Sequence, residues 1–170
     1  MQEIIVNEGK IKCLITGKMR KETQEEYVRQ EYCRLLLDVY KYPKEHIDVE
    51  YSIKVGSTSK RCDIVVFSDE NKSQDNILWI VETKKKDEKE GINQLWSYMS
   101  ATTAMFGTWT NGESILYFHK DTRRSNRYIE LPDIPKYKES LDSIGKYKRS
   151  DLVRCTDLKG VFKRCNNYFF

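Results

Sequence analysis

Apolar residues recur along this 170-residue chain at two different spacings, and each spacing predicts one kind of element. Between residues 23 and 40 they lie three or four positions apart, as on one face of an amphipathic helix. Thr23 and Glu26 form a capping box at the start of this helix, and Pro43 follows its end. Its apolar positions are Val28, Tyr32, Leu35, Leu36 and Val39. Before it, apolar segments on both sides of residues 7–10 predict a short N-terminal hairpin.

Three strands are predicted after this helix. Residues 47–55 alternate apolar and polar side chains, which is typical of a half-buried strand. Residues 61–67 and 77–84 are almost continuously apolar, so both predict buried strands, and the second is expected at the centre of a sheet. Turn residues at 56–60 and a polar loop at 68–76 separate the three strands.

A second helix and a fourth strand follow. The helix is predicted within residues 90–107, with Gly107 as the left-handed residue after its end. Its apolar face contains Ile92, Leu95, Trp96, Met99 and Thr103. Residues 108–120 then predict a strand that contains or follows the turn Asn111-Gly112. The predicted order of helix, three strands, helix and strand places the chain in the α/β class.

The periodicity disappears beyond residue 120. Residues 121–150 are basic and contain two prolines, so we expect a long surface connection anchored by apolar side chains. The expected anchors are Leu131, Ile134, Leu141 and Ile144. Near the C terminus, residues 157–170 place several apolar side chains on one helical face. We therefore predict a core with its N-terminal hairpin at residues 1–120, and a connection with a C-terminal helix leading to a further domain at 121–170.

Charge and cysteine content limit the possible partners, metal sites and cellular location of the chain. The net charge is +4, and residues 91–170 carry 13 Lys/Arg against 8 Asp/Glu. This excess fits a polyanionic partner such as nucleic acid, and it equally fits a solvated surface. The five cysteines are scattered and never form CxxC, which argues against a disulfide framework and a zinc site. No apolar run approaches the ~20 residues of a membrane span and no secretory signal is recognisable, so a cytoplasmic location is expected.

Two charged residues, Glu82 and Lys84, lie at the end of the most apolar strand. They share one face of that strand, and a hairpin with the preceding strand brings Asp63 beside Glu82. At so short a distance, two carboxylates repel each other unless a cation lies between them. Oxygen ligands in a partly open site suit Mg²⁺ or Mn²⁺, and the lysine supplies the positive charge that a phosphodiester transition state needs.

A purely structural interpretation of these residues remains open. In it Asp63 pairs with Arg61, and Glu82 and Lys84 form an ion pair at the edge of the sheet. Glu50, on the first strand, is better explained as a surface or ion-pair residue than as a metal ligand. His46 and His119 have no partner at a recognisable spacing, so the sequence does not support nucleophilic catalysis.

The order of elements and these residues resemble the restriction-endonuclease-like nucleases with the PD-(D/E)xK motif. Asp63 and Glu82-Thr83-Lys84 match the motif, with Cys62 in place of its usual proline. The segments 15–37, 46–55, 81–87, 93–99 and 110–118 resemble, more narrowly, the N-terminal nuclease domain of type I restriction enzyme R subunits and related fused restriction-modification proteins. The resemblance covers roughly residues 10–119 and implies a mixed central sheet flanked by helices.

The resemblance also implies roles for individual residues. Asp63 and Glu82 would bind the metal ion with the main-chain oxygen of Thr83, and Lys84 would orient or deprotonate the attacking water. Gln94 and Tyr98 match a Q-x-x-x-Y element thought to contact DNA or to position the catalytic groups. From helical geometry alone, both lie opposite the apolar face, towards a cleft or solvent. Arg123, Arg124 and Arg127 are candidate phosphate contacts or simply solvated.

Such sites often add an acid from the first helix, and helical geometry separates three candidates. At ~100° per residue, Glu25 lies ~35° from the centre of the apolar stripe, Glu31 ~85° and Glu26 ~135°. Glu25 is therefore directed inward, towards the expected metal ion. Glu26 is explained by the capping box, and Glu31 by a solvated position on the flank.

Together these observations predict a Mg²⁺-dependent DNA endonuclease domain of a type I or fused restriction-modification system. The alternatives are a DNA repair or recombination nuclease of the same fold, and a catalytically idle DNA-binding or assembly module. The sequence contains no G-x-x-x-x-G-K-[ST] and no methylase motif. Sequence recognition and ATP-driven translocation are therefore expected from methylase and specificity subunits or from fused domains.

Overall fold

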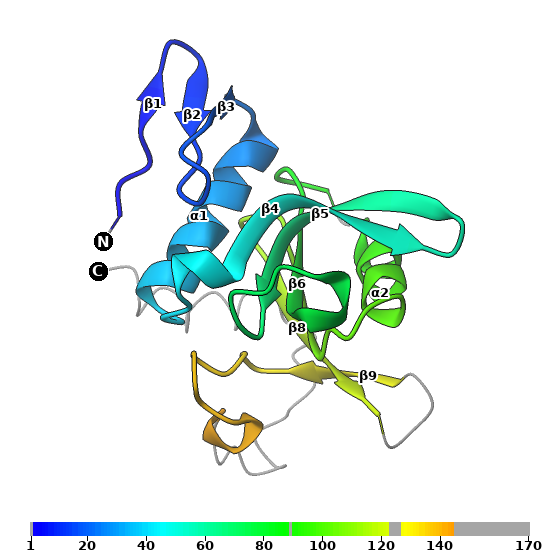
Figure 1. The fold of residues 1–170 in the computed structure, drawn as a ribbon. Coiled ribbons are helices and arrows are strands. Elements are labelled where there is room, and N and C mark those ends of the chain that lie inside the picture. Colours follow the sequence, from blue (N-terminus) through cyan, green and yellow to red (C-terminus); the bar gives the residue numbers. More distant parts are fainter. Residues whose placement is uncertain (1, 89, 123–126, 145–170) are drawn as a thin grey trace.

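The computed structural model describes residues 2–88, 90–122 and 127–144. Short 3₁₀ turns occur at Lys44–His46, Gln74–Asn76 and Leu141–Ser143. The helices and strands (Figure 1) are β1 (Val6–Asn7), β2 (Lys10–Lys12), β3 (Met19–Lys21), α1 (Gln24–Asp38), β4 (Ile47–Val55), β5 (Thr58–Phe67), β6 (Ile77–Thr83), α2 (Ile92–Ser100), β7 (Phe106–Thr110), β8 (Ile115–Asp121) and β9 (Arg127–Leu131). The predicted C-terminal helix lies outside the described residues.

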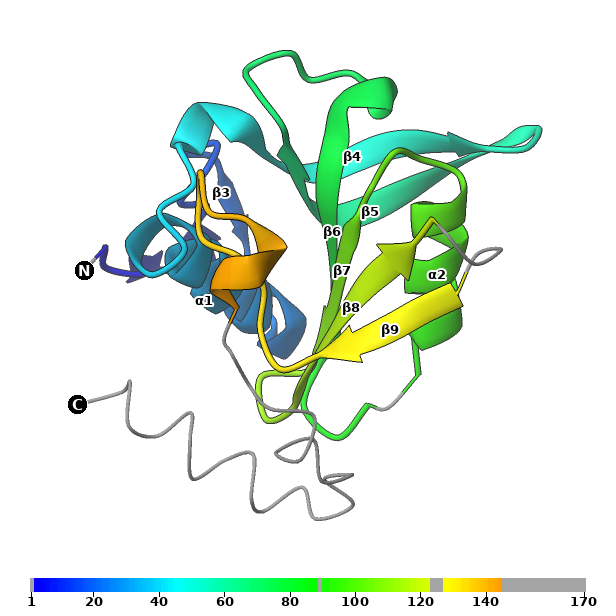
Figure 2. The ribbon, with the colours of Figure 1, turned by 90° about the horizontal axis from the view of Figure 1, so that it is seen from below.

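The central sheet has the order β4-β5-β6-β7-β8-β9. β6 and β7 are parallel and the other neighbours are antiparallel, so the sheet is mixed. Joining two parallel neighbours requires a crossover, which α2 supplies. α1 and α2 lie on opposite faces of the sheet (Figure 2). The structure confirms the α/β class, the order of helix, three strands and helix, and the interior position of β6. The single strand predicted at residues 108–120 is instead two antiparallel strands, β7 and β8, on either side of the turn Asn111-Gly112.

Each face of the sheet has its own apolar core. On the α1 side, the fully buried Trp79 meets the rings of Tyr32, Tyr40 and Tyr42 nearly edge-on, with centroids 5.2–6.0 Å away. Leu95 and Met99 of α2 pack with residues of β4, β5 and β6 on the other side. Because β6 contributes to both cores, its near-continuous apolar sequence is explained. In the described part of the chain, no helix is long and apolar enough to cross a membrane.

The apolar side chains of β4 lie on one face of the sheet in the first half of the strand and on the other face in the second half. Ile47 and Val49 pack in the core beneath α1, whereas Ile53 packs in the core beneath α2. Between them Glu50 adopts φ +56°, a left-handed conformation that an L-residue rarely takes. The register with β5 is the same before and after Glu50, so no position is inserted, and β5 changes face at the same point, between Cys62 and Ile64. The single apolar face predicted for residues 47–55 was therefore wrong.

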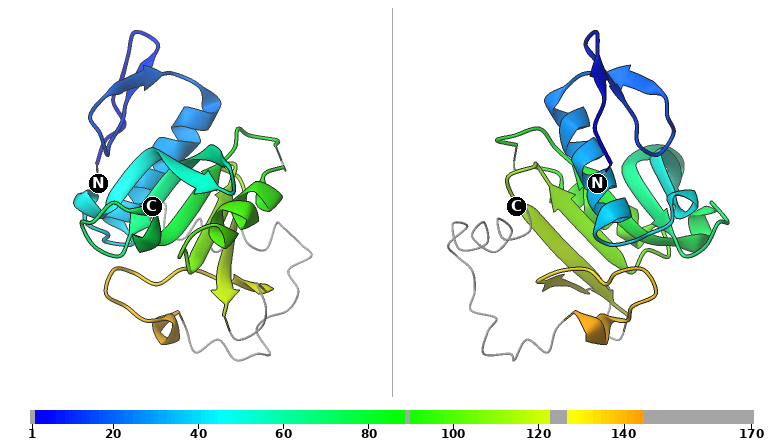
Figure 3. Two further views of the ribbon diagram at one scale, coloured as in Figure 1. Left: turned by 45° about the vertical axis from the view of Figure 1, so that its right-hand side comes forward. Right: turned by 90° about the vertical axis from the view of Figure 1, so that its left-hand side faces the viewer.

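The N-terminal part forms a small antiparallel sheet, β1-β2-β3, at the beginning of α1 (Figure 3). Its first two strands confirm the predicted hairpin, and β3 adds a third strand. The main-chain NH of Leu14 donates to Oε1 of Gln30 at 2.7 Å, which ties this region to α1. As a result α1 buries a second stripe, Glu26, Arg29, Gln30 and Cys33, which its apolar pattern did not predict. Val39, predicted on the apolar face, is 40% exposed where the helix ends.

α2 ends at Ser100, seven residues before the predicted limit. The hydroxyl of Thr102 donates to the carbonyl of Tyr98 at 2.9 Å and so satisfies a carbonyl of the last turn. Gly107 is not the helix cap but a residue of β7, where a Cβ would lie 2.3 Å from Sδ of Met99. Its lack of a side chain therefore permits close packing of α2 on the sheet.

The region after residue 120 is only partly an irregular connection. β9 pairs with β8 and forms the edge of the central sheet, so the sheet continues to Leu131. Ile134 is 2% exposed, as expected of an anchor, while Leu141 is 38% exposed. Strand β9 was missed because its short sequence, RYIEL, lacks a clear apolar alternation.

Replacing Trp79 by Phe should lower the free energy of unfolding by about 2 kcal/mol. The substitution removes part of a fully buried ring and the hydrogen bond from its Nε1 to Oγ1 of Thr108, 2.9 Å long. Urea unfolding followed by circular dichroism measures the change.

Trp96→Phe is the matched control. Nε1 of Trp96 is buried but has no hydrogen-bond partner among the described residues, and its ring stacks on Tyr128. Because Phe retains the stacking and removes an unsatisfied donor, the loss should stay below about 1 kcal/mol. Equal losses in the two variants would contradict this account.

Candidate active site

Asp63 and Glu82 lie on neighbouring strands at one end of the central sheet. Ile64 is opposite Val81 in the antiparallel pair of β5 and β6, so the next position places Asp63 opposite Glu82. Oδ2 of Asp63 accepts hydrogen bonds from the main-chain NH of Thr83 at 2.8 Å and from its hydroxyl at 3.1 Å. These two bonds direct the Asp63 carboxylate towards the segment that carries Glu82, as the sequence predicted.

Glu82 is a carboxylate that is almost completely buried, with 1% of its surface exposed. Nζ of Lys84 lies 2.5 Å from its Oε1, whereas its Oε2 is buried and has no hydrogen-bond partner among the described residues. Burial, together with the negative charge of Asp63, raises the pKa of Glu82 to about 7, against the opposing effect of Lys84. A buried carboxylate oxygen without a partner is costly, so this atom is a candidate ligand for a cation.

Lys84 is held close to Glu82 by its surroundings. Burial acts to lower the pKa of its ammonium group, but the hydrogen bond and charge of Glu82 outweigh burial, so the pKa of Lys84 is raised. The residue preceding α2, Gly91, has φ +113°, and a Cβ there would lie 2.6 Å from Cε of Lys84. Glycine at this position therefore leaves room for the lysine side chain.

Gln94 and Tyr98 connect α2 to the strand that carries Asp63. Nε2 of Gln94 donates to the hydroxyl of Tyr98 at 2.6 Å, and that hydroxyl donates to the carbonyl of Arg61 at 3.3 Å. Gln94 is exposed, whereas Tyr98 is only 4% exposed, so of the two positions expected for Tyr98, a cleft or solvent, the structure excludes solvent. The pKa of the Tyr98 phenol is raised by burial and, secondarily, by the nearby acids, which places it beside the site.

Arg29 of α1 is the residue that sequence reasoning missed. Its Nη2 lies 2.8 Å from Oδ1 of Asp63, and its Nη1 lies 2.6 Å from Oε2 of Glu26. Arg61, the partner considered for Asp63, instead approaches Glu50 at 3.8 Å with a largely exposed side chain, so that predicted pair was wrong. The spacing of Arg29 from Glu25 and Glu26, four and three residues, was the available signal.

The three acids of α1 differ from one another as follows. Glu25 contacts Nη2 of Arg29 at 3.5 Å, and its charge acts on both Glu82 and Lys84, so it lies at the rim of the site. Glu31 pairs with Arg34 in a partly exposed position. The main-chain NH of Glu26 donates to the hydroxyl of Thr23, as a capping box requires. Its carboxylate, however, is buried against Arg29 because β1-β3 covers that side of the helix.

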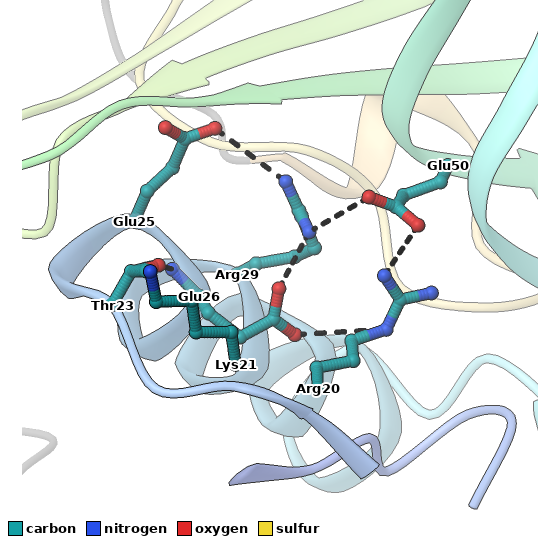
Figure 4. A pocket seen from close by; sticks show the side chains of 7 residues that line it. All are labelled: Arg20, Lys21, Thr23, Glu25, Glu26, Arg29 and Glu50. Atoms are coloured by element: carbon teal, nitrogen blue, oxygen red, sulfur yellow. Dashed lines mark hydrogen bonds and ion pairs between the residues drawn. The ribbon is translucent and has the colours of Figure 1, made fainter. Parts of the chain in front are cut away.

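Glu50 completes the charged group, and the prediction that it forms an ion pair is confirmed. It accepts a hydrogen bond from Nη1 of Arg20, and its Oε1 lies 3.6 Å from Nη1 of Arg29. The left-handed backbone at Glu50 occurs at the register position opposite Asp63. An open pocket of about 330 Å³ (Figure 4) is lined by Arg20, Lys21, Thr23, Glu25, Glu26, Arg29 and Glu50.

Residues 24–135 match the family model described as the type I restriction enzyme R protein N terminus (HSDR_N). The chain belongs to this family. The match spans α1 to the segment after β9, and it therefore includes the whole central sheet and the acids, Lys84 and Arg29 described above.

Two solved structures are similar to this type I R-protein N-terminal domain. One is a candidate nuclease belonging to DUF820 from Anabaena variabilis ATCC 29413, with 14% identity, a TM-score of 0.42 and coverage of 70% of this chain and 76% of that chain. The other is a fragment of a candidate HsdR subunit of a type I restriction enzyme from Vibrio vulnificus YJ016, with 20% identity and a TM-score of 0.44. That match covers 72% of this chain and only 25% of the fragment. No curated protein is significantly similar to the sequence.

The predicted phosphate contacts are not part of the described site. Arg123 and Arg124 lie outside the described residues, and of Arg127 only its main-chain position at the start of β9 is described. Their role in DNA binding stays a prediction.

The side chains at the site fit a divalent ion of the magnesium type. Within residues 2–88, 90–122 and 127–144, no three His, Cys, Asp or Glu side chains are grouped so as to hold a metal ion alone. Mg²⁺ does not require such a group, because it binds through one or two carboxylates and keeps water and substrate phosphate as its other ligands. Oε2 of Glu82, buried beside Asp63 and without a partner in the described part of the chain, meets this requirement.

The raised pKa of Glu82 predicts a pH-dependent cost of burying its charge. The pKa of Glu82 is about 7 in the folded state and 4.5 in the unfolded state. The folded state therefore holds the proton more tightly, and the stability that this provides is fully present below pH 4.5 and is lost as the pH rises through 7. Relative to Glu82→Gln, the wild type should therefore lose on the order of 3 kcal/mol between about pH 4.5 and about pH 7.5.

Urea unfolding at a series of pH values, without divalent ions, measures this difference. Glu31→Gln is the matched control, because the Glu31 side chain is 46% exposed. A difference in unfolding free energy between the wild type and the Glu82→Gln variant that stays constant across this pH range would contradict the raised pKa of Glu82.

Proposed function

We propose that this domain is a Mg²⁺-dependent endodeoxyribonuclease that cuts DNA as part of a type I or fused restriction-modification system. Membership of the R-protein N-terminal family supports a restriction-enzyme role. The observation that carries the nuclease assignment is the unpartnered, buried Oε2 of Glu82 beside Asp63, with Lys84 two positions further along. The arrangement agrees with the PD-(D/E)xK pattern, in which two acids and a lysine share one site.

The residues have separable roles in this proposal. Asp63 and Glu82 hold Mg²⁺, or Mn²⁺ in its place, together with the main-chain oxygen of Thr83. When bound, the ion polarises the scissile phosphate and lowers the pKa of the attacking water. Lys84, whose raised pKa keeps it charged, orients that water and stabilises the negative charge that develops on the phosphate.

Neighbouring residues position this group. Tyr98, with Gln94 hydrogen-bonded to it, fixes α2 against the carbonyl of Arg61, two residues before Asp63. In this proposal Gln94, which is exposed, is available to contact DNA. Glu25 lies at the rim of the site, where its charge adds to the attraction for a cation.

Sequence recognition and ATP-driven translocation are assigned to other parts of the assembly. The chain spans a quarter of the HsdR fragment that it resembles, and we propose methylase and specificity subunits, or fused domains, as its cytoplasmic partners. A repair or recombination nuclease would use the same residues without such partners.

One further candidate function has an observation behind it. Each acid already has a cationic neighbour, Arg29 for Asp63 and Lys84 for Glu82. If these pairs persist in solution with Mg²⁺ present, the domain is a catalytically idle DNA-binding or assembly module.

The nuclease proposal is tested with supercoiled plasmid and Mg²⁺ or Mn²⁺, in the presence and absence of methylase and specificity subunits with ATP. Asp63→Ala and Lys84→Ala should each lower the nicking rate by about 100-fold or more, because the first removes a ligand of the ion and the second removes a positive charge beside the reacting phosphate. Agarose gel electrophoresis of the nicked and linear forms gives the rate.

Lys86→Ala is the matched control, since Lys86 is two residues further along, is 59% exposed and pairs only with Glu113 among the described residues. Its rate should equal that of the wild type. Unimpaired nicking by Asp63→Ala would remove Asp63 from the mechanism, and no nicking by the wild type with its partners present would favour the idle module.

A further inference from the structure

A single buried cation, Arg29, lies among four carboxylates of the described residues. Its side chain is 8% exposed and contacts acids from three elements: α1, β4 and β5. The nitrogen-oxygen distances are 2.6 Å to Glu26, 2.8 Å to Asp63, 3.5 Å to Glu25 and 3.6 Å to Glu50. In Figure 4 the guanidinium lies between Glu25 and Glu50.

The two oxygens of Asp63 face different partners. Oδ2 accepts from Thr83 on the β6 side, where Glu82 lies, and Oδ1 faces Nη2 of Arg29 on the α1 side. In two-metal sites that cut phosphodiesters, the ions are about 3.5–4 Å apart and a carboxylate bridges them. Asp63 has the position of such a bridge, and Glu25, Glu26 and Glu50 are the other acids around Arg29 on its α1 side. Arg29 occupies the place where a second ion would meet them.

Arg29 is not readily displaced from this place. Its guanidinium stays protonated at any ordinary pH, and its pKa is raised further by Asp63 and Glu26 against the effect of burial. Removing it would leave the Glu26 carboxylate, 5% exposed, with only the more distant charge of Arg20, at 3.8 Å, in place of the one at 2.6 Å. On the other side of Asp63 the situation differs, because Oε2 of Glu82 has no partner among the described residues to be displaced.

We propose that Arg29 fills the position of a second divalent ion, so that the site binds one ion, between Glu82 and Asp63. This inference rests on the metal site proposed above and adds the number of ions to it. Arg29 is then a positioning residue that neutralises Asp63 from the α1 side. On the β6 side, where Oδ2 of Asp63 accepts from Thr83, the oxygen left for the ion is Oε2 of Glu82. The pocket lined by Glu25, Arg29 and Glu50 opens to solvent, so an ion would reach the α1 side if the guanidinium were absent.

The test counts Mn²⁺ ions bound per full-length chain, by electron paramagnetic resonance of free Mn²⁺ and by isothermal titration calorimetry. The wild type should bind one ion, and Glu82→Gln should abolish it. The variant Glu26→Gln with Arg29→Met removes one negative and one positive buried charge together, and it should bind two ions. Adding Glu25→Gln should return the count to one. Arg34→Met, on the same helix but paired with Glu31, should still bind one ion.

The outcomes separate this inference from the proposed function. Two ions in the wild type, seen also as a spin-coupled Mn²⁺ pair, would overturn the role of Arg29 and leave the nuclease proposal intact. A folded double variant that binds only one ion would do the same. The wild-type count needs no substitution and decides the question if the double variant fails to fold. No ion bound to the wild type would instead overturn the metal site itself.

Discussion

The site depends on the ion pair between Arg29 and Asp63, which joins α1 to the end of the central sheet. In the register of the sheet, Asp63 lies opposite Glu82 of β6 on one side and opposite Glu50 of β4 on the other. Three acids at neighbouring register positions repel one another, and in a half-buried location that repulsion is weakly screened. Arg29 offsets it by approaching Asp63 and Glu50 with different nitrogens. α1, β4 and β5 are thereby held in one arrangement around the carboxylates.

The backbone of β4 also departs from regular strand geometry at this group of acids, because the strand changes face at Glu50. A strand with regular alternation would place Glu50 on a fixed face, decided by its apolar neighbours. At φ +56° the chain instead changes face there, so that Val49 and Ile53 enter different cores while the Glu50 carboxylate meets Arg20 and Arg29. Left-handed backbone at a non-glycine residue costs of order 1–2 kcal/mol, and it persists where surrounding contacts outweigh that cost. Its position opposite Asp63 links the strain to the site.

The apolar pattern predicted what local periodicity determines, namely the order of elements, the interior strand β6 and the meeting of Asp63 with Glu82. It failed where distant segments decide the outcome. Glu26 was explained by the capping box alone because only the apolar stripe of α1 was considered, yet β1-β3 buries the opposite stripe. Gly107 was expected to end a helix, but it lies in a strand against Met99. In each case the missing information was which element packs on which.

Lys84 and Arg29 are both cations beside acidic residues, but they differ in the number of their contacts and in their exposure. Arg29 is fixed by contacts to four carboxylates and is 8% exposed. Lys84 is 15% exposed and, among the described residues, pairs with Glu82 alone, through one oxygen. A divalent ion at the other oxygen would weaken the hold of Glu82 on the ammonium, because the carboxylate charge would then be shared. In the proposed nuclease, the lysine would then be released towards the phosphate of the DNA while the arginine stayed in place, so Arg29 would serve the scaffold and Lys84 the chemistry.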